Sequence, residues 1–163
     1  MDTWNWGNYK VGSIEDMPGD PVGFVYRIDN YTNGKFYIGK KSILSITNPE
    51  ISEKKYRELK AEGEPVMRTK NKAKSTKGKT VWRYKRKQHK TETNWLSYTG
   101  SNKDLNRDIK DGHKIAKSIL KFCYTKSELT LREVEEQFKQ EVLDRCDSYN
   151  SNVLGKFFNQ IKC

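Results

Sequence analysis

Alternation of apolar and polar residues near the start of the chain predicts a β-hairpin. Strand-forming residues run over 24–28 and again over 35–38, and the turn pair Asn33-Gly34 lies between them. A compact apolar run over 119–124 predicts a third strand. Together these segments indicate a small, mainly antiparallel sheet of three strands.

Two short segments, 52–63 and 101–112, are predicted to be helical. Each begins with a serine that can cap a helix, Ser52 or Ser101, and each ends at a glycine. In the second segment two apolar residues four positions apart share one face of the helix. Both segments are therefore expected to be short helices at the margin of the sheet.

The clearest amphipathic helix covers residues 127–144. Thr130 and Glu133 have the spacing of a capping box near its start. Its apolar residues fall on one stripe, as expected for a helix that packs on a sheet: Leu131, Val134, Phe138 and Val142. The chain order of hairpin, helix, short helix, strand and helix predicts an α+β fold, with helices flanking the three-stranded sheet.

The chain is expected to contain one domain with a basic insertion. Residues 1–22 are rich in turn formers and are predicted to be an N-terminal arm, followed by a domain over residues 23–163. The insertion lies around residues 64–92, and its part from 68 to 90 holds eleven Lys and Arg and no acidic residue. Through Lys79 this part favours a loop. From Thr80 onward aromatic residues alternate with cations, which suits a surface that binds a phosphate backbone.

The overall charge narrows the class of partner. The 163 residues include 32 Lys and Arg against 21 Asp and Glu, which gives a net charge of +11. The commonest polyanionic partner of so basic a protein is nucleic acid. Charge alone does not separate a nucleic-acid-binding protein from one that is merely soluble and basic.

The cysteines and the chain start indicate a cytoplasmic protein. Three scattered cysteines, Cys123, Cys146 and Cys163, argue against a disulfide framework and against a Cys/His zinc site, and reduced thiols fit a cytosolic setting. The first ten residues lack the apolar stretch of a secretory signal. No run approaches the roughly 18 apolar residues of a membrane span, so no membrane association is expected.

The predicted hairpin closely resembles the opening of GIY-YIG nucleases. That family begins with Gly-Ile-Tyr on one strand and Tyr-Ile-Gly on the next. Here Phe24-Val25-Tyr26 stands in the first position, with Gly23 one place early, and Tyr37-Ile38-Gly39 reproduces the second triplet. The stretches "WLSYTGSNKDLNRDIKDG", "ILKFCYTKSELT" and "SYNSN" follow in the order of phage-type members, so that the resemblance covers residues 22–155.

The resemblance implies a phage-encoded endonuclease of the host cytoplasm that nicks or cuts duplex DNA with Mg²⁺, or another divalent cation such as Mn²⁺. A DNA-processing or packaging protein is a second candidate partner. Phosphodiester hydrolysis needs a deprotonated water, a metal ion and cations for the developing negative charge. A non-catalytic, basic DNA- or RNA-binding module with a degenerate nuclease fold is the alternative, because the first glycine is missing. A ribosome-associated RNA-binding protein is a third interpretation.

By similarity, Tyr26 would activate or orient the water, and Tyr37 would support it. Strand alternation lets both side chains project over one cleft. Without the motif, both are ordinary strand residues with cross-strand packing. Asn150 in "SYNSN" matches the asparagine that closes the family's site, and Asn152 is the adjacent alternative.

The family carries an arginine, often with a histidine one turn later, on the helix after the second strand, and here the insertion displaces that position. Arg86 is the candidate for the transition-state cation, because a planar guanidinium matches phosphate oxygens. Arg83 and Lys85 are alternatives, and His89, on one helix face with Lys85, would transfer a proton. The candidate DNA contacts are Gly39, Lys40, Lys41, Arg83, Lys85 and Lys87.

The metal ion is expected on a glutamate of the helix at 127–144. Mg²⁺ prefers oxygen ligands and keeps several waters, so that one carboxylate suffices. The family pattern of a Glu followed four residues later by a Gln points to Glu133 with Gln137. Helical position favours Glu135 as a second metal candidate, because it borders the apolar stripe whereas Glu133 would point away. Glu136 is the third acid in this group.

Overall fold

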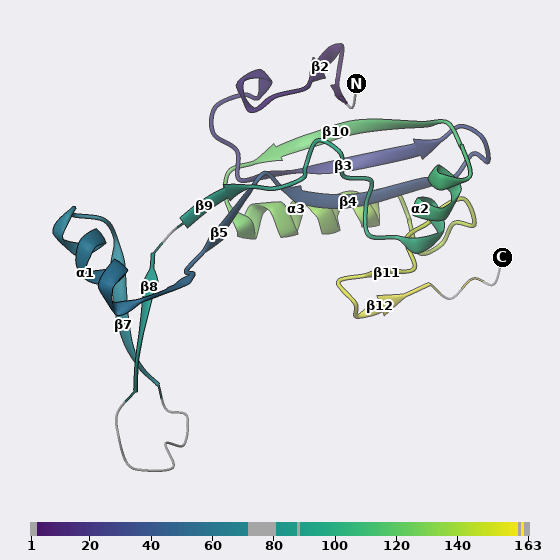
Figure 1. Ribbon diagram of the computed structural model, residues 1–163. Coiled ribbons are helices and arrows are strands. Elements are labelled where there is room, and N and C mark those ends of the chain that lie inside the picture. Colours follow the sequence, from purple (N-terminus) through teal and green to yellow (C-terminus); the bar gives the residue numbers. More distant parts are fainter. Residues whose placement is uncertain (1–2, 72–80, 88, 160, 162–163) are drawn as a thin grey trace. The chain divides into compact units, whose positions relative to one another are not determined.

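The computed structural model describes residues 3–71, 81–87, 89–159 and 161. The chain forms two compact units (Figure 1). The main unit consists of Met1–Ile43 and Thr93–Cys163, and the inserted unit consists of Leu44–Glu92. The inserted unit therefore begins earlier in the chain than the basic insertion expected from residue 64.

The main unit contains a five-stranded mixed sheet with the strand order β2-β1-β10-β3-β4. The predicted hairpin is formed by β3 (Gly23–Asn30) and β4 (Phe36–Ser42), and β10 (Ile115–Cys123) pairs antiparallel with β3. β1 (Trp4–Trp6) runs parallel to β10, and β2 (Tyr9–Val11) closes that edge. β4 is therefore the last strand at the opposite edge.

The α+β class is confirmed, but the sheet is larger than the three strands predicted. Residues expected to form an N-terminal arm supply β1 and β2, because Trp4 and Val11 are fully buried. The Trp4 ring lies edge-on to Phe24 and Tyr26, with centroid distances of 5.0 and 5.2 Å. Strands of three residues are too short to show alternation in a sequence, which is why the pattern missed them. A short 3-10 helix, η1 (Ile14–Asp16), follows β2.

The predicted short helix of the main unit is α2 (Lys103–Lys110). Its N-cap is Asn102, one residue later than expected, and the Asn102 side chain accepts a hydrogen bond from the Leu105 N–H at 2.9 Å. Leu105 is fully buried. Gly112 follows the helix with φ of 88°, a left-handed conformation that suits glycine.

Helix α3 (Lys126–Lys139) packs on β4, β3 and β10, and the predicted apolar stripe is only partly buried: Val134 packs against the core and Val142, beyond the helix, is buried. Leu131 and Phe138 are 61% and 52% exposed, whereas Leu129 and Gln137 are buried. The helix begins earlier than expected, because Thr125 and not Thr130 caps it. The row that turns toward the sheet is therefore the one that contains residues 129, 133 and 137, each one turn apart.

The C-terminal part of the main unit adds a small hairpin, β11 (Asn152–Val153) with β12 (Phe157–Phe158). Cys123 is a buried free thiol, as expected. Cys146 is disulfide-bonded, which corrects the expectation of reduced thiols throughout. In the described part of the chain no helix has the length and apolar character of a membrane span.

The inserted unit contains helix α1 (Glu53–Ala61), which confirms the predicted helix with Ser52 as its N-cap. A three-stranded sheet has the order β6-β8-β7, with β6 (Glu50–Ile51), β8 (Val81–Arg86) and β7 (Val66–Asn71). β5 (Leu44–Thr47) pairs antiparallel with β9 (His89–Glu92).

Two expectations for the basic segment change. Lys85 lies on β8 and His89 on β9, so they do not share a helix face and that prediction is wrong. Basic residues alternate with aromatic ones here, a period of two that suits a strand better than a helix. The loop predicted through Lys79 gives way to strand β7 up to Asn71, and the rest of it lies outside the described residues.

Candidate active site

The candidate site lies along the outer edge of β4. An edge strand presents N–H and C=O groups that have no neighbouring strand to bind. A C-terminal segment occupies part of this edge: the Phe36 N–H donates to the Asp147 carbonyl, and the Phe36 carbonyl accepts from the Tyr149 N–H, both at 2.8 Å. The segment therefore extends the sheet by one short bridge, Phe36 with Ser148.

Asn150 continues this edge pairing with its side chain. Its Nδ2 donates to the Ile38 carbonyl at 2.8 Å, and its Oδ1 accepts from the Ile38 N–H at 2.9 Å. Gln137 of α3 donates a further hydrogen bond to the Ile38 carbonyl at 3.2 Å. Both amides are buried, where an unsatisfied polar group is costly. Asn150, a predicted site residue, thus fixes the strand that carries the Tyr-Ile-Gly triplet.

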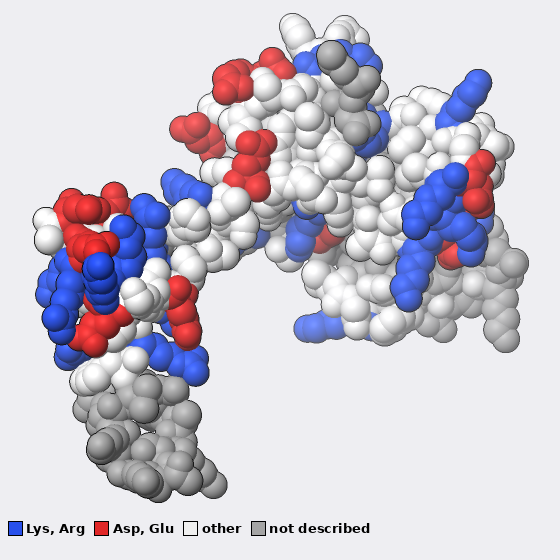
Figure 2. All heavy atoms as spheres, in the orientation of Figure 1, with Lys and Arg blue, Asp and Glu red and all other residues white. Residues whose placement is uncertain are grey.

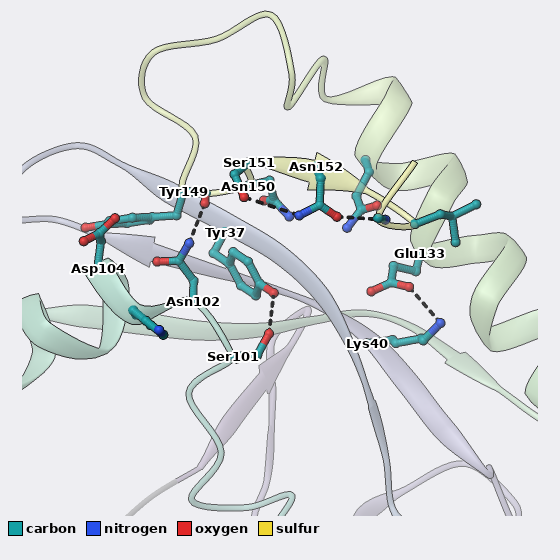
Figure 3. Close-up of a pocket in the computed structure, with 14 residues that line it drawn as sticks. Tyr37, Lys40, Ser101, Asn102, Asp104, Glu133, Tyr149, Asn150, Ser151 and Asn152 are labelled. Atoms are coloured by element: carbon teal, nitrogen blue, oxygen red, sulfur yellow. Dashed lines mark hydrogen bonds and ion pairs between the residues drawn. The ribbon is translucent and has the colours of Figure 1, made fainter. Parts of the chain in front are cut away.

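A pocket of about 650 Å³ opens along the same edge (Figure 3). Its walls include Tyr37 and Lys40 of β4 and Glu133 of α3. Tyr37 and Lys40 are three residues apart, so their side chains leave the strand on opposite faces. Both reach one pocket because β4 is the edge strand and the pocket extends around it.

Tyr26 and Tyr37 lie on one face of the hairpin, as predicted, since Tyr26 is opposite Gly39 and Tyr37 opposite Ile28. Their ring centroids are 6.1 Å apart. Their accessibility differs: Tyr26 is 1% exposed, whereas Tyr37 lines the pocket and its hydroxyl lies 3.3 Å from Ser101 Oγ. Tyr37 is therefore the phenol at the pocket surface, and Tyr26 packs behind it.

Burial raises the pKa of both phenols above the ordinary tyrosine value, and the neighbouring tyrosines add to the effect on Tyr26. The ordinary pKa is already about 10. The protonated form of both phenols is therefore favoured at neutral pH, and the Tyr37 hydroxyl at the pocket can donate a hydrogen bond.

Two glycines make room for these rings. A Cβ at Gly39 would lie 2.6 Å from the Tyr26 hydroxyl and 3.0 Å from the Tyr37 ring. A Cβ at Gly100, whose φ is 90°, would lie 3.0 Å from the Tyr37 ring. The space at Gly39, expected for approach of DNA, is occupied by the Tyr26 side chain.

Of the three predicted glutamates of α3, Glu133 is the one that lines the pocket. Its Oε2 lies 2.9 Å from Lys40 Nζ, and its side chain is 16% exposed. Lys40 also donates to the Thr130 hydroxyl at 3.0 Å. Glu135 is exposed and pairs with Arg132, and Glu136 pairs with Lys139. Helical position was expected to turn Glu135 toward the sheet and Glu133 away from it. That expectation is wrong, because Glu133 lies on the face of α3 that turns toward the sheet.

The other predicted cations lie elsewhere. Lys41 donates to Asn94 Oδ1 at 2.7 Å and lies over the Tyr98 ring, 4.0 Å from its centroid, where burial lowers the pKa of the lysine. The remaining predicted cations and the histidine belong to the inserted unit, so the pocket of the main unit is built without them: Arg83, Lys85, Arg86, Lys87 and His89.

Several residues of the site were not expected from the sequence. Tyr98 lies edge-on to Tyr26, with centroids 6.1 Å apart, and Lys103 is a second cation of the pocket wall. Ser101 and Asn102 line the same wall. All come from the stretch "SYTGSNK", in which Gly100 was the signal that the chain turns closely against another group.

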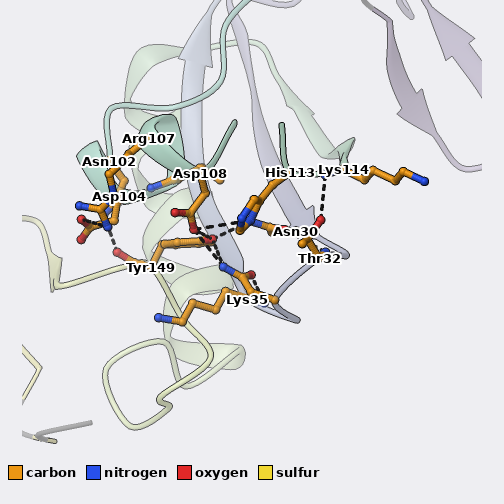
Figure 4. A network of polar contacts seen from close by, with 12 residues as sticks. Asn30, Thr32, Lys35, Asn102, Asp104, Arg107, Asp108, His113, Lys114 and Tyr149 are labelled. Carbon is orange, nitrogen blue, oxygen red and sulfur yellow. Dashed lines mark hydrogen bonds and ion pairs between the residues drawn. The ribbon is translucent and has the colours of Figure 1, made fainter. Parts of the chain in front are cut away.

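A polar network holds the segment next to Asn150 in place (Figure 4). The Tyr149 hydroxyl donates to Asp108 Oδ2 at 2.6 Å and accepts from the Asn30 amide at 2.8 Å. Asn33, in the hairpin turn, donates to both Tyr149 and Asp108. The bond from Tyr149 lowers the pKa of Asp108, so the carboxylate is charged at neutral pH. The network therefore ties the hairpin, α2 and the C-terminal segment together.

The donors of the pocket fit a hard divalent cation. Glu133 and Asp104 offer carboxylates, and residues with amide and hydroxyl oxygens also line the pocket. Mg²⁺ is commonly held by one or two carboxylates and several waters. In the described part of the chain, His, Cys, Asp and Glu form no cluster of three or more that could hold a metal ion. A cation bound here would have the Glu133 carboxylate and water as ligands, and Asp104 is a second carboxylate of the pocket lining.

The Tyr-Ile-Gly edge strand, the inward glutamate of α3 and the asparagine that pairs with the strand together define a GIY-YIG-type domain. A family model described as "Putative endonuclease segE, GIY-YIG domain" matches residues 6–161. The chain belongs to this SegE GIY-YIG family, which confirms the resemblance found in the sequence. Comparison with curated proteins and with solved structures gave no match.

Proposed function

We propose that the protein is a phage-encoded, divalent-metal-dependent endonuclease that hydrolyses phosphodiester bonds of duplex DNA. The observation that carries the proposal is the convergence of Tyr37, Lys40 and Glu133 on one pocket at the edge of β4. A proton donor, a cation and a carboxylate are the groups that phosphodiester hydrolysis needs.

Each side chain has a role that follows from its surroundings. Glu133 would hold Mg²⁺ or Mn²⁺, which supplies a Lewis acid and an acidified water when bound. Tyr37, protonated because burial raises its pKa, would orient the water or a phosphate oxygen by a hydrogen bond. Tyr26 supports the Tyr37 ring from behind. Asn150 keeps β4 in register with the C-terminal segment.

Lys40 is our choice for the cation that stabilises negative charge on the phosphate. Its ammonium already lies 2.9 Å from Glu133, in the pocket itself. Arg86, favoured by chemistry alone, pairs with Glu64 at 3.1 Å in the inserted unit. Lys103, which also lines the pocket, would be a second cation for a neighbouring phosphate.

The direct test is cleavage of supercoiled plasmid by the full chain. We expect relaxed or linear product with Mg²⁺ or Mn²⁺ and none with EDTA. Glu133→Gln removes the carboxylate charge and should lower the rate by at least about 10²-fold. Glu135→Gln, on the solvent side of the same helix, is the matched control and should cut like the native protein. Undiminished cutting by Glu133→Gln, or in EDTA, would contradict the mechanism.

A binding module without nuclease activity is the second candidate. It is favoured by the Lys40–Glu133 ion pair, in which the carboxylate already has a cation partner. Salt-dependent DNA binding, with no cleavage under Mg²⁺ or Mn²⁺ at any protein concentration, would support it over the enzyme.

A further inference from the structure

Most of the positive charge of the chain lies in the inserted unit. Residues 44–92 hold fifteen Lys and Arg against six Glu, so this unit carries +9 of the net +11. The main unit is more than twice as long, yet it holds seventeen Lys and Arg against fifteen Asp and Glu, a net +2. The unit that contains the pocket therefore has little long-range attraction for a polyanion.

Within the inserted unit, strand β8 separates its side chains between two faces. Alternation puts Tyr84 and Arg86 on one face and Arg83 and Lys85 on the other. Helix α1 covers the first face, where the Tyr56 and Tyr84 rings lie 4.9 Å apart. On that face the Arg86 guanidinium is also engaged by Glu64.

Among the described residues of the inserted unit α1 is the one helix, and the opposite face carries cations that it does not cover. We call Arg83, Lys85 and Lys87 the strand face; Lys87 directly follows β8 and is exposed. The residues of β7 that pair with Arg83 and Lys85 are Thr69 and Met67, which bring no charge. Figure 2 shows Lys and Arg side chains, interspersed with acidic ones, over the inserted unit.

One carboxylate competes for the strand face. Glu50 of β6 lies opposite Lys85 in the sheet, and its Oε1 is 3.0 Å from the Arg83 guanidinium. Both side chains of this pair are about half exposed, at 49% and 56%. An exposed ion pair of this kind is weak, so a phosphate group can replace the carboxylate.

We propose that the strand face binds the phosphate backbone of duplex DNA, so that the inserted unit supplies most of the affinity and the main unit the chemistry. The choice of DNA rests on the proposed function. Same-face residues of a strand are about 7 Å apart, so each cation meets a separate phosphate. Because β8 is the central strand of the sheet β6-β8-β7, these cations project from the surface of a sheet toward the phosphate backbone.

The test measures how the affinity of the full chain for a labelled duplex DNA depends on salt concentration. Binding is measured by fluorescence anisotropy, in EDTA so that no cleavage occurs. Each lost phosphate contact reduces the slope of log K against log salt by about 0.9. The triple variant R83Q/K85Q/K87Q should therefore reduce the slope by about 2 to 3. The matched control K54Q/K55Q/R57Q removes the same charge from α1 and should reduce it by less than about 1.

A single substitution tests the same surface in the opposite direction. Glu50→Gln frees the Arg83 guanidinium without removing a cation, and we expect binding to become about two- to fivefold tighter. This variant leaves the strand face intact, so a misfolded unit is not an explanation for tighter binding.

Three outcomes would overturn the inference. Equal loss of slope in both triple variants would mean that net charge alone acts, and an unchanged slope in both would mean that DNA binds elsewhere. Equally tight binding of a duplex RNA, lost in the same triple variant, would exclude the assignment to DNA. Because these measurements need no cleavage, they are independent of the proposed nuclease activity, which the plasmid assay tests separately.

Discussion

In the main unit, buried aromatic and aliphatic side chains hold the sheet on both faces, from Trp4 and Trp95 on one side to Ile38 and Leu129 on the other. In the inserted unit, Leu59 is the one buried residue among those whose burial the structure describes. The first unit is close to neutral and the second strongly basic. A site that must hold its groups to a fraction of an ångström needs the packed support of the first unit, whereas a surface that binds phosphates needs only charge and reach.

The largest expected effect concerns the cleavage rate, which we assign to the main unit, as opposed to DNA affinity, which we assign to the inserted unit. Lys40→Met removes the pocket cation and should lower the single-turnover cleavage rate by about 10²-fold, while DNA affinity in EDTA stays nearly unchanged. The triple variant R83Q/K85Q/K87Q of the inserted unit should instead weaken binding more than it slows the cleavage of bound DNA. Arg86→Met, on the face that α1 covers, should change neither quantity strongly. Quench-flow or gel assays at saturating protein measure the rate, and anisotropy measures the affinity.

The opposite result would contradict this assignment of catalysis and binding to separate units. If Arg86→Met slows the cleavage of saturated complexes as much as Lys40→Met does, the transition-state cation comes from the inserted unit. The assignment of catalysis to the main unit and of DNA binding to the inserted unit would then be wrong.

The second comparison concerns stability. Leu105→Ala deletes a fully buried side chain of the main unit and should lower its free energy of unfolding by about 2–5 kcal/mol. Leu59→Ala makes the same chemical change in the inserted unit and should leave the main thermal transition in place. Its expected effect is faster hydrogen exchange confined to α1 and the strands it contacts.

Calorimetry and hydrogen exchange with mass spectrometry measure both variants. A shift of the main transition by Leu59→Ala as large as that by Leu105→Ala would show that the two units unfold as one.

The smallest effect concerns the role of the pocket phenol. Burial raises the pKa of Tyr37 above its ordinary value, so the folded protein keeps this proton through the neutral range and loses it only at alkaline pH. Tyr37→Phe removes a hydrogen bond and should lower the cleavage rate by about tenfold, without changing the shape of the rate profile between pH 6 and 9. A profile that loses its rise with pH in Tyr37→Phe would instead identify the phenol as the base.

The sequence predicted the elements that depend on local pattern. The hairpin at Asn33-Gly34, the helix capped by Ser52 and the strand that ends at Cys123 all appear in the structure. Strand alternation also predicted that Tyr26 and Tyr37 share a face, because the hairpin register follows from a short turn. The Glu-x-x-x-Gln spacing pointed to Glu133, the glutamate of α3 that lines the pocket.

Other features depended on packing between distant segments. The apolar residues of α3 predicted the buried face only in part, since Val134 packs against the core whereas Leu131 and Phe138 are exposed. The N-terminal strands were missed, because three residues that pair with a strand more than a hundred positions away leave no local pattern. The choice of cation also depends on tertiary structure: the guanidinium favoured Arg86 in the sequence, whereas Lys40 is the predicted cation that lines the pocket of the main unit.

By itself, the sequence determined the nuclease family, the hairpin with its two tyrosines and the uneven distribution of basic residues. Each of these is local: a motif, a period of two, or a count. Only the tertiary structure decided that β4 ends the sheet, that Asn150 pairs with its free backbone edge and that one pocket joins Tyr37 to Glu133 around that edge. These features arise because an edge strand exposes both of its faces and its backbone to segments far along the chain, which no local pattern records.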